Sequence, residues 1–269
     1  MKSKLFLWII ALSISFHVHA QEAYLDYLSR VGDVVSTSVT ELTREVRLLG
    51  SGVPSASFDE DFQTLKEKTV LLWVLREAEA MLTEFKTPSR AYALTTHVAS
   101  PSDVLSIANE LTNEAVTRAV DLSVEAANLR FDRKNYTAQL LAGYPAPGAS
   151  TEELSQIAVT RDNLESEINS LLQREIEIRQ SIPVAYVEAA LHAAVVELRQ
   201  ADVGVLESAE KAGAAFEFLI FSASAAYADA LIFLGKTRMD VDELIRGLDA
   251  IDGATGLQFR AIEDATPYL

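Results

Sequence analysis

Few residues in the sequence have types and spacings that could do chemistry. Outside residues 1–20 the chain holds two histidines, His97 and His192, and it contains no cysteine. His192 follows Glu188 by four residues, so the two side chains can share one face of a helix. A carboxylate-bridged metal site in a helical bundle requires Glu-x-x-His on two helices, and neither histidine has that spacing. We interpret His192 as a helix-face histidine beside a carboxylate, and we predict no metal and no cofactor.

The motifs of common enzymes and ion-binding loops are missing from the sequence as well. It has no Gly-x-Ser-x-Gly turn and no glycine-rich phosphate loop. The acidic stretches 240–243 and 249–253 lack the alternating acids, glycine and closing glutamate of a calcium loop, and helix capping explains them better. We therefore predict no catalytic residues and expect that the protein is not an enzyme.

Signals for helices run along nearly the whole chain. Helix starts are marked by capping boxes or by a hydroxyl before a proline, at Ser57–Glu60, Thr87-Pro88, Ser100-Pro101 and Ser150–Glu153. Glycines and prolines at 50–54 and 143–147 mark helix ends. Residues 70–75 are apolar all round, which predicts a helix that is buried on several sides. The pattern predicts an all-α protein with well over half of its residues in helices.

Residues 151–182 have the most regular apolar spacing in the chain. Steps of three and four residues alternate along Leu154, Ile157, Arg161, Leu164, Ile168, Leu171, Glu175 and Ile178. This spacing is typical of a coiled-coil seam, here with charges at two core positions. A short connection to the preceding helix favours a long antiparallel hairpin over 101–182. We predict that the seam faces a neighbouring helix and that both charged residues meet an opposite charge or reach solvent.

After the hairpin, the sequence predicts two more helices. Pro183 should end or kink the helix before it. Residues 184–234 read as one long alanine-rich helix that lets its neighbours approach closely, with bends allowed at Gly204 and Gly213. A short helix is expected over 241–251. Because no linker and no repeat divides the chain, we predict a single helical domain over 21–269, built as an elongated multi-helix bundle.

The first 20 residues have the three parts of a secretory signal peptide. Lys2 and Lys4 precede an apolar run over 5–14, and Val18-His19-Ala20 offers a cleavage site. The run is short for a membrane span of about 20 residues. A lipid anchor at the cleavage site would need a cysteine, which the sequence lacks. We therefore expect export of 21–269 to a periplasm or to the outside of the cell, and not as a lipoprotein.

The charge of the exported chain excludes one class of partner. The signal segment holds two of the 23 Lys and Arg residues and none of the 39 Asp and Glu residues, so its removal leaves a net charge of −18. Such a surface repels phosphate backbones, and we predict no nucleic-acid binding. The same charge opposes docking on anionic lipids.

The segment 212–235 leaves two functions open. It holds two charged residues, Glu217 and Asp229, among large apolar ones. The latter are Phe216, Phe218, Leu219, Ile220, Phe221, Leu231, Ile232 and Phe233. As a buried helix it would belong to an exported interaction or scaffold protein with unidentified protein partners, such as an accessory subunit of an envelope or secretion assembly. As a membrane-inserting element it would belong to a pore-forming type of protein. We expect the interaction or scaffold protein, because an acidic side chain costs about 2.5–3.5 kcal/mol at the bilayer centre. Whether the protein forms a homo-oligomer is left open by the sequence.

Overall fold

The computed structural model describes residues 2–50, 58–95, 102–143 and 150–238, and these residues form helices without any strand. In chain order the helices are α1 (Lys2–Gly50), α2 (Phe58–Phe85), α3 (Pro88–Thr95), α4 (Asp103–Ala142), α5 (Thr151–Asp202) and α6 (Leu206–Arg238). The predicted all-α class and the helical hairpin are confirmed. The helix predicted over 241–251 and the caps predicted at Ser57 and Ser100 lie outside the described residues.

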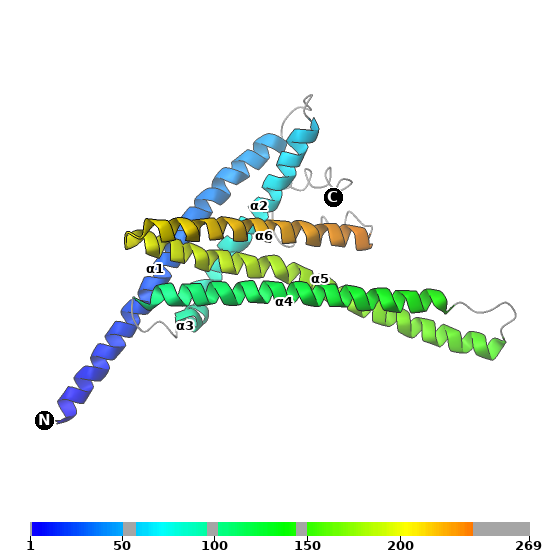
Figure 1. The fold of residues 1–269 in the computed structure, drawn as a ribbon, viewed down its shortest axis with the longest axis horizontal. Coiled ribbons are helices and arrows are strands. Elements are labelled where there is room, and N and C mark those ends of the chain that lie inside the picture. The colour runs from blue at the N-terminus through cyan, green and yellow to red at the C-terminus, as the bar shows by residue number, and fades with distance from the viewer. Residues whose placement is uncertain (1, 51–57, 96–101, 144–149, 239–269) are drawn as a thin grey trace.

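The helices form two crossing groups (Figure 1). α4, α5 and α6 run side by side, each antiparallel to the one before it, and α1 and α2 cross them steeply. α5 is the central element, since it contacts α4, α6, α1 and α2. The far ends of α4 and α5 extend past the end of α6. We call the part of α5 that extends past α6, residues 151–169, together with the end of α4 beside it, the arm.

α5 begins as predicted but does not end where expected. The Ser150 side chain accepts a hydrogen bond from the Glu153 N–H, and the Glu153 carboxylate accepts one from the Ser150 N–H. The helix then continues through Pro183 to Asp202, so of the two outcomes predicted there, an end or a kink, the end was wrong. A proline inside a helix costs about 3 kcal/mol locally. Its neighbours on α5 are buried against several helices, and we attribute the continuity of α5 to that packing.

The predicted single helix over 184–234 was also wrong, because the chain reverses at Gly204. This glycine has a φ of +79°, a left-handed conformation that other residues rarely adopt. Its N–H donates to the carbonyl of Ala201, and the N–H of Val205 donates to that of Gln200, which together form a Schellman motif. α6 therefore returns along α5. Gly213 lies within α6, where an added Cβ would meet the Glu197 carboxylate at 2.9 Å.

A similar difference occurs at Thr87. The sequence predicts that this hydroxyl caps the helix that begins at Pro88. In the structure the hydroxyl donates to the carbonyl of Glu84, so it closes the end of α2 instead.

The main core lies where α1 and α2 cross α5 and α6. α1 contributes a stripe of buried residues that includes Leu28, Val31 and Val35, and α2 contributes residues 70–75, most of which are buried. α5 contributes alanines, namely Ala185, Ala189, Ala190, Ala193 and Ala194. Small side chains let neighbouring helices approach to the short end of the usual 8–10 Å range. The central position of α5 thus follows from its composition.

Two leucines of α5 should differ strongly in their contribution to stability. Leu191 is fully buried in the main core, whereas Leu164 in the arm is half-buried. We expect Leu191→Ala to cost about 2–5 kcal/mol and Leu164→Ala at most about half as much, because truncation costs scale with the cavity left behind. Urea unfolding of the two variants measures the difference. Equal losses would show that the arm is covered in solution.

Candidate interaction surface

α6 has one face in the core and one face in solvent. On the inner face Leu219, Ile220 and Leu231 are buried. Phe216, Ile232 and Phe233 are half-buried. On the outer face the side chains of Phe218 and Phe221 are 66% and 71% exposed. The expectation that this segment is buried therefore holds for its inner face alone.

The outer face of α6 is apolar around its two phenylalanines. Ala214 and Ala225, one or two turns away on the same side, are exposed as well. Glu217 lies at one edge, and Lys211 pairs with Glu207 beyond the N-terminal end. We call Ala214, Phe218, Phe221 and Ala225 the α6 patch. Exposed aromatic side chains of this size, grouped on one helix, are typical of interaction surfaces.

Polar and aromatic contacts fix α6 on the bundle. Near its C-terminal end Asp229 pairs with Arg179 of α5, and the Arg179 guanidinium lies 4.5 Å from the ring centre of Phe233. Two residues before Asp229, the ring of Tyr227 lies 6.1 Å from that of Trp73 in α2. These contacts anchor α6 between Tyr227 and Phe233, on the C-terminal side of the α6 patch.

The predicted seam of α5 is buried progressively along its length. Leu154 is exposed, Ile157, Arg161, Leu164, Ile168 and Leu171 are half-buried, and Glu175 and Ile178 are buried. The ion pairs Arg133–Glu175 and Arg118–Glu188 set the antiparallel register of α4 and α5. In this register the end of α4 at Ala142 lies opposite residues 164–166, so the first turns of α5 extend past it. The prediction that Leu154 and Ile157 face a neighbouring helix was therefore wrong.

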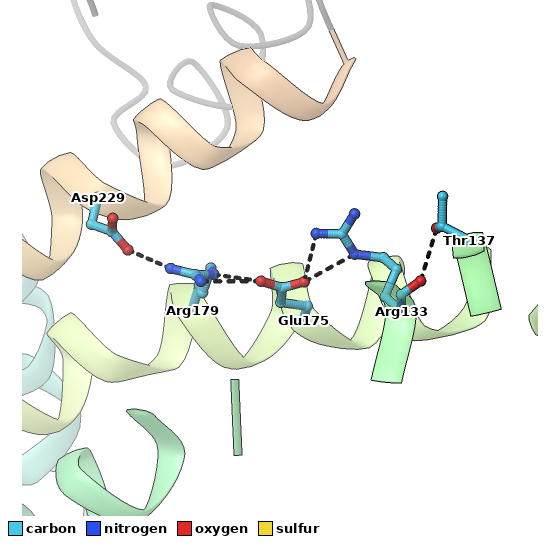
Figure 2. A network of polar contacts seen from close by, with 5 residues as sticks. All are labelled: Arg133, Thr137, Glu175, Arg179 and Asp229. Atoms are coloured by element: carbon cyan, nitrogen blue, oxygen red, sulfur yellow. Dashed lines mark hydrogen bonds and ion pairs between the residues drawn. The ribbon is translucent and has the colours of Figure 1, made fainter. Parts of the chain in front are cut away.

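The charge at the inner end of the seam is fully paired (Figure 2). The Glu175 carboxylate, which has no exposed area, lies 3.1 Å from an Arg133 nitrogen and 3.0 Å from an Arg179 nitrogen. Arg179 also pairs with Asp229, so the network joins α4, α5 and α6. Arg161 lies at the surface, 3.8 Å from Glu165. The prediction for both seam charges is confirmed.

His192 lies in the core where α1, α2 and α5 meet, away from the α6 patch and from the exposed part of the α5 seam. Burial lowers the pKa of His192 to about 3, and the Arg118 guanidinium acts in the same direction. Burial also raises the pKa of Tyr24, so its hydroxyl stays protonated, and it shares a hydrogen bond of 2.7 Å with His192 Nδ1. The Phe85 ring stacks on the imidazole at 5.6 Å. Glu188, expected beside the histidine, pairs instead with Arg118.

This histidine should make stability depend on pH. A group whose pKa is lowered by folding binds more protons in the unfolded chain, so stability falls as pH falls from about 6.5 toward about 3. The loss is up to about 1.4 kcal/mol per pH unit. We expect the gap in unfolding free energy between the wild type and His192→Gln to shrink by about 2 kcal/mol between pH 7 and pH 5. Urea unfolding at both pH values measures it, and a constant gap would contradict the burial of a neutral imidazole.

No family model, curated protein or solved structure matches this chain. Within the described residues, no group of three or more His, Cys, Asp or Glu side chains is placed to hold a metal ion. The sequence identified the segment that carries the α6 patch but not which side chains face outward. The sequence did not predict the contacts of Tyr24, Phe85 and Arg133, because the partners of these residues lie far away in the chain and leave no local pattern.

Proposed function

We propose that this protein is an exported helical interaction protein that binds a protein partner through the α6 patch. The observation that carries the proposal is the exposure of Phe218 and Phe221 on a helix whose opposite face is built into the core. Aromatic anchors on a rigid element are the usual centres of protein interfaces. An accessory subunit of an envelope or secretion assembly fits this description.

The inner face of α6 supports a docking role without a change of fold. Each of Leu219, Ile220 and Leu231 contributes about 1.5–3 kcal/mol by burial. Together with the anchors at Asp229 and Tyr227, this burial opposes release of the helix. A partner that binds the outer face leaves all of these contacts in place.

A membrane-active role is the second candidate, and one observation favours it. Two of the described helices, α5 and α6, are long and apolar enough to cross a bilayer by length and composition. In α5 about two thirds of the apolar window is buried, as in a core helix. In α6 only about one third of the window is buried, and this exposed apolar surface favours the membrane-active role.

Charge favours a protein partner over a bilayer. Glu207, Glu210 and Glu217 surround the α6 patch, with Lys211 as the nearby cation. Together with the net charge of −18 expected after export, these acids repel anionic headgroups. Insertion of the whole of α6 into a bilayer would also carry Glu217 and Asp229 into the hydrocarbon, at a cost of several kcal/mol.

A tryptophan at the α6 patch separates the two candidates. The variant Phe218→Trp is mixed with vesicles of zwitterionic lipid, or of zwitterionic and anionic lipid, that contain a trapped dye. Phe131→Trp, on the exposed side of α4, is the matched control. We expect the same emission with and without vesicles for both variants, and no dye release. A blue shift in the Phe218→Trp variant alone, or dye release at sub-micromolar protein, would replace the docking proposal by the membrane one.

A further inference from the structure

The spacing of the α6 patch favours a partner that is itself a helix. Ala214, Phe218, Phe221 and Ala225 follow one another at steps of four, three and four residues, which is the heptad spacing of a coiled-coil seam. All four side chains are exposed, and they extend over about 16 Å of α6 at 1.5 Å per residue. A helix of about three turns laid along this stripe would cover all of it.

The sizes of the four side chains determine the sizes of their counterparts. In a helix pair each apolar side chain inserts between side chains of the facing helix, so large residues are best met by small ones. Phe218 and Phe221 lie at the centre of the α6 patch, and an alanine lies at each end. The patch therefore fits a helix with small residues in the middle of its apolar stripe and larger residues toward both ends.

One flank of the α6 patch is acidic. At 100° per residue, Glu210 and Glu217 lie on the same side of α6, exposed and one heptad apart. The carboxylate of Glu197 in α5 lies next to this flank, close to Gly213. Within the described residues, none of these three glutamates forms an ion pair. Burial and the Glu217 carboxylate both raise the pKa of Glu197, as expected where acids lie together without a cation.

The other charges beside the α6 patch already have opposite partners. They are joined in two ion pairs, Lys211–Glu207 and Asp229–Arg179. The cations at 236 and 238 lie about three turns or more past the patch. The acidic flank is therefore the part of this surface that most strongly attracts positive charge from a partner.

We propose that the partner of the α6 patch is a basic amphipathic helix, whose apolar stripe covers Phe218 and Phe221 and whose Lys or Arg side chains lie along the acidic flank. Two such cations, one heptad apart in the partner, would meet Glu210 and Glu217, and the second would also offset Glu197. The inference rests on the proposed function and adds the chemical class of the partner. We expect the aromatic side chains to supply most of the affinity and the charges to supply specificity.

Synthetic peptides of about three heptads serve as probes of this surface. The basic peptide has an apolar heptad stripe, with alanine in the middle and leucine toward the ends, and lysine on both flanks. The acidic peptide has glutamate in place of each lysine. The shuffled peptide has the composition of the basic peptide without its stripe.

Fluorescence anisotropy of labelled peptides measures their binding to the purified protein, at about 150 mM salt to screen long-range attraction. We expect a dissociation constant in the micromolar range for the basic peptide and values at least tenfold higher for the other two. No binding of the basic peptide at protein concentrations up to about 200 µM would overturn the inference.

Two single substitutions show whether the basic peptide binds the α6 patch. Phe218→Asp should weaken its binding at least tenfold. Phe131→Asp, at an exposed position of α4, is the matched control and should bind as the wild type does. Circular dichroism confirms that each variant is folded. Equal binding by the wild type and Phe218→Asp would place the peptide elsewhere and overturn the inference.

Charge reversal tests the acidic flank. In the double variant Glu210→Lys, Glu217→Lys we expect the acidic peptide to bind more tightly than the basic one. The double variant Glu110→Lys, Glu114→Lys reverses as many charges at exposed positions of α4 and should keep the preference for the basic peptide. The same change of preference in both double variants, or tight binding of the shuffled peptide, would show attraction to net charge alone and contradict the inference. A protein partner of another shape at the α6 patch would remove this inference and leave the proposed function standing.

Discussion

Replacing Glu175 by alanine should destabilise the protein by about 3–5 kcal/mol, one of the two largest effects that we expect of a single substitution. The carboxylate is fully buried and holds Arg133 and Arg179 from two sides. Without it, two guanidinium groups lie close together in the bundle with a single carboxylate, that of Asp229, at one edge. Urea unfolding at neutral pH, followed by circular dichroism, measures the loss.

The neighbouring Glu177 provides the matched control for this substitution. It lies two residues further along α5, is exposed, and accepts a hydrogen bond from Gln173. Glu177→Ala should change stability by less than about 1 kcal/mol, as exposed polar contacts usually do. Glu175→Gln, which keeps the shape but removes the charge, should fall between the two. A loss below about 1 kcal/mol in Glu175→Ala would mean that the network does not hold α4, α5 and α6 together.

Phe85→Ala should cost about 3–5 kcal/mol and change the titration of His192 at the same time. Phe85 is almost fully buried, and its ring covers one side of the imidazole. Removal of the ring leaves a cavity and brings water closer to the histidine, which reduces the burial that lowers its pKa. We therefore expect the pKa of His192 to rise from about 3 toward its usual value of 6.5.

Nuclear magnetic resonance of the His192 ring as a function of pH measures this shift directly. Phe131→Ala, at an exposed position of α4, should leave both stability and the His192 titration unchanged within about 0.5 kcal/mol. If Phe85→Ala lowers stability but leaves the pKa of His192 near 3, burial by the stacked ring is not what keeps the imidazole neutral.

The local features of the fold could be predicted from the sequence. The capping box at Ser150 begins α5 as expected, because its two hydrogen bonds involve residues three apart. The stripe of α1, including Leu28, Val31 and Val35, is buried because a helix repeats every 3.6 residues. Pairing of the two seam charges was predictable too, since an unpaired buried charge is too costly to keep.

Other features depend on contacts that local patterns do not carry. Pro183 favours a helix end by itself, and α5 nevertheless continues through it. Leu154 fits the heptad spacing, but the facing helix ends too early to cover it. Tyr24 and His192 are 168 residues apart in the chain, so their hydrogen bond had no sequence signal.

The residues of the α6 patch could not be predicted from local sequence patterns either. Composition identified the segment 212–235 as apolar, but adjacent residues there have opposite environments. Leu219 and Ile220 are buried, whereas Phe218 and Phe221 on either side of them are exposed. Which side faces outward depends on how α6 returns along α5 after Gly204.

The central claim is that a protein partner binds the outer face of α6, and site-specific photo-crosslinking in the native host tests it most directly. A benzophenone amino acid is placed at position 221, with probes at the exposed Phe131 in α4 and at the exposed Asn169 in the arm as matched controls. We expect a discrete adduct with another protein from position 221, weakened at least several-fold by Phe218→Asp, and a different pattern from both controls. No adduct above background at position 221, or the same adducts at Asn169, would contradict the claim.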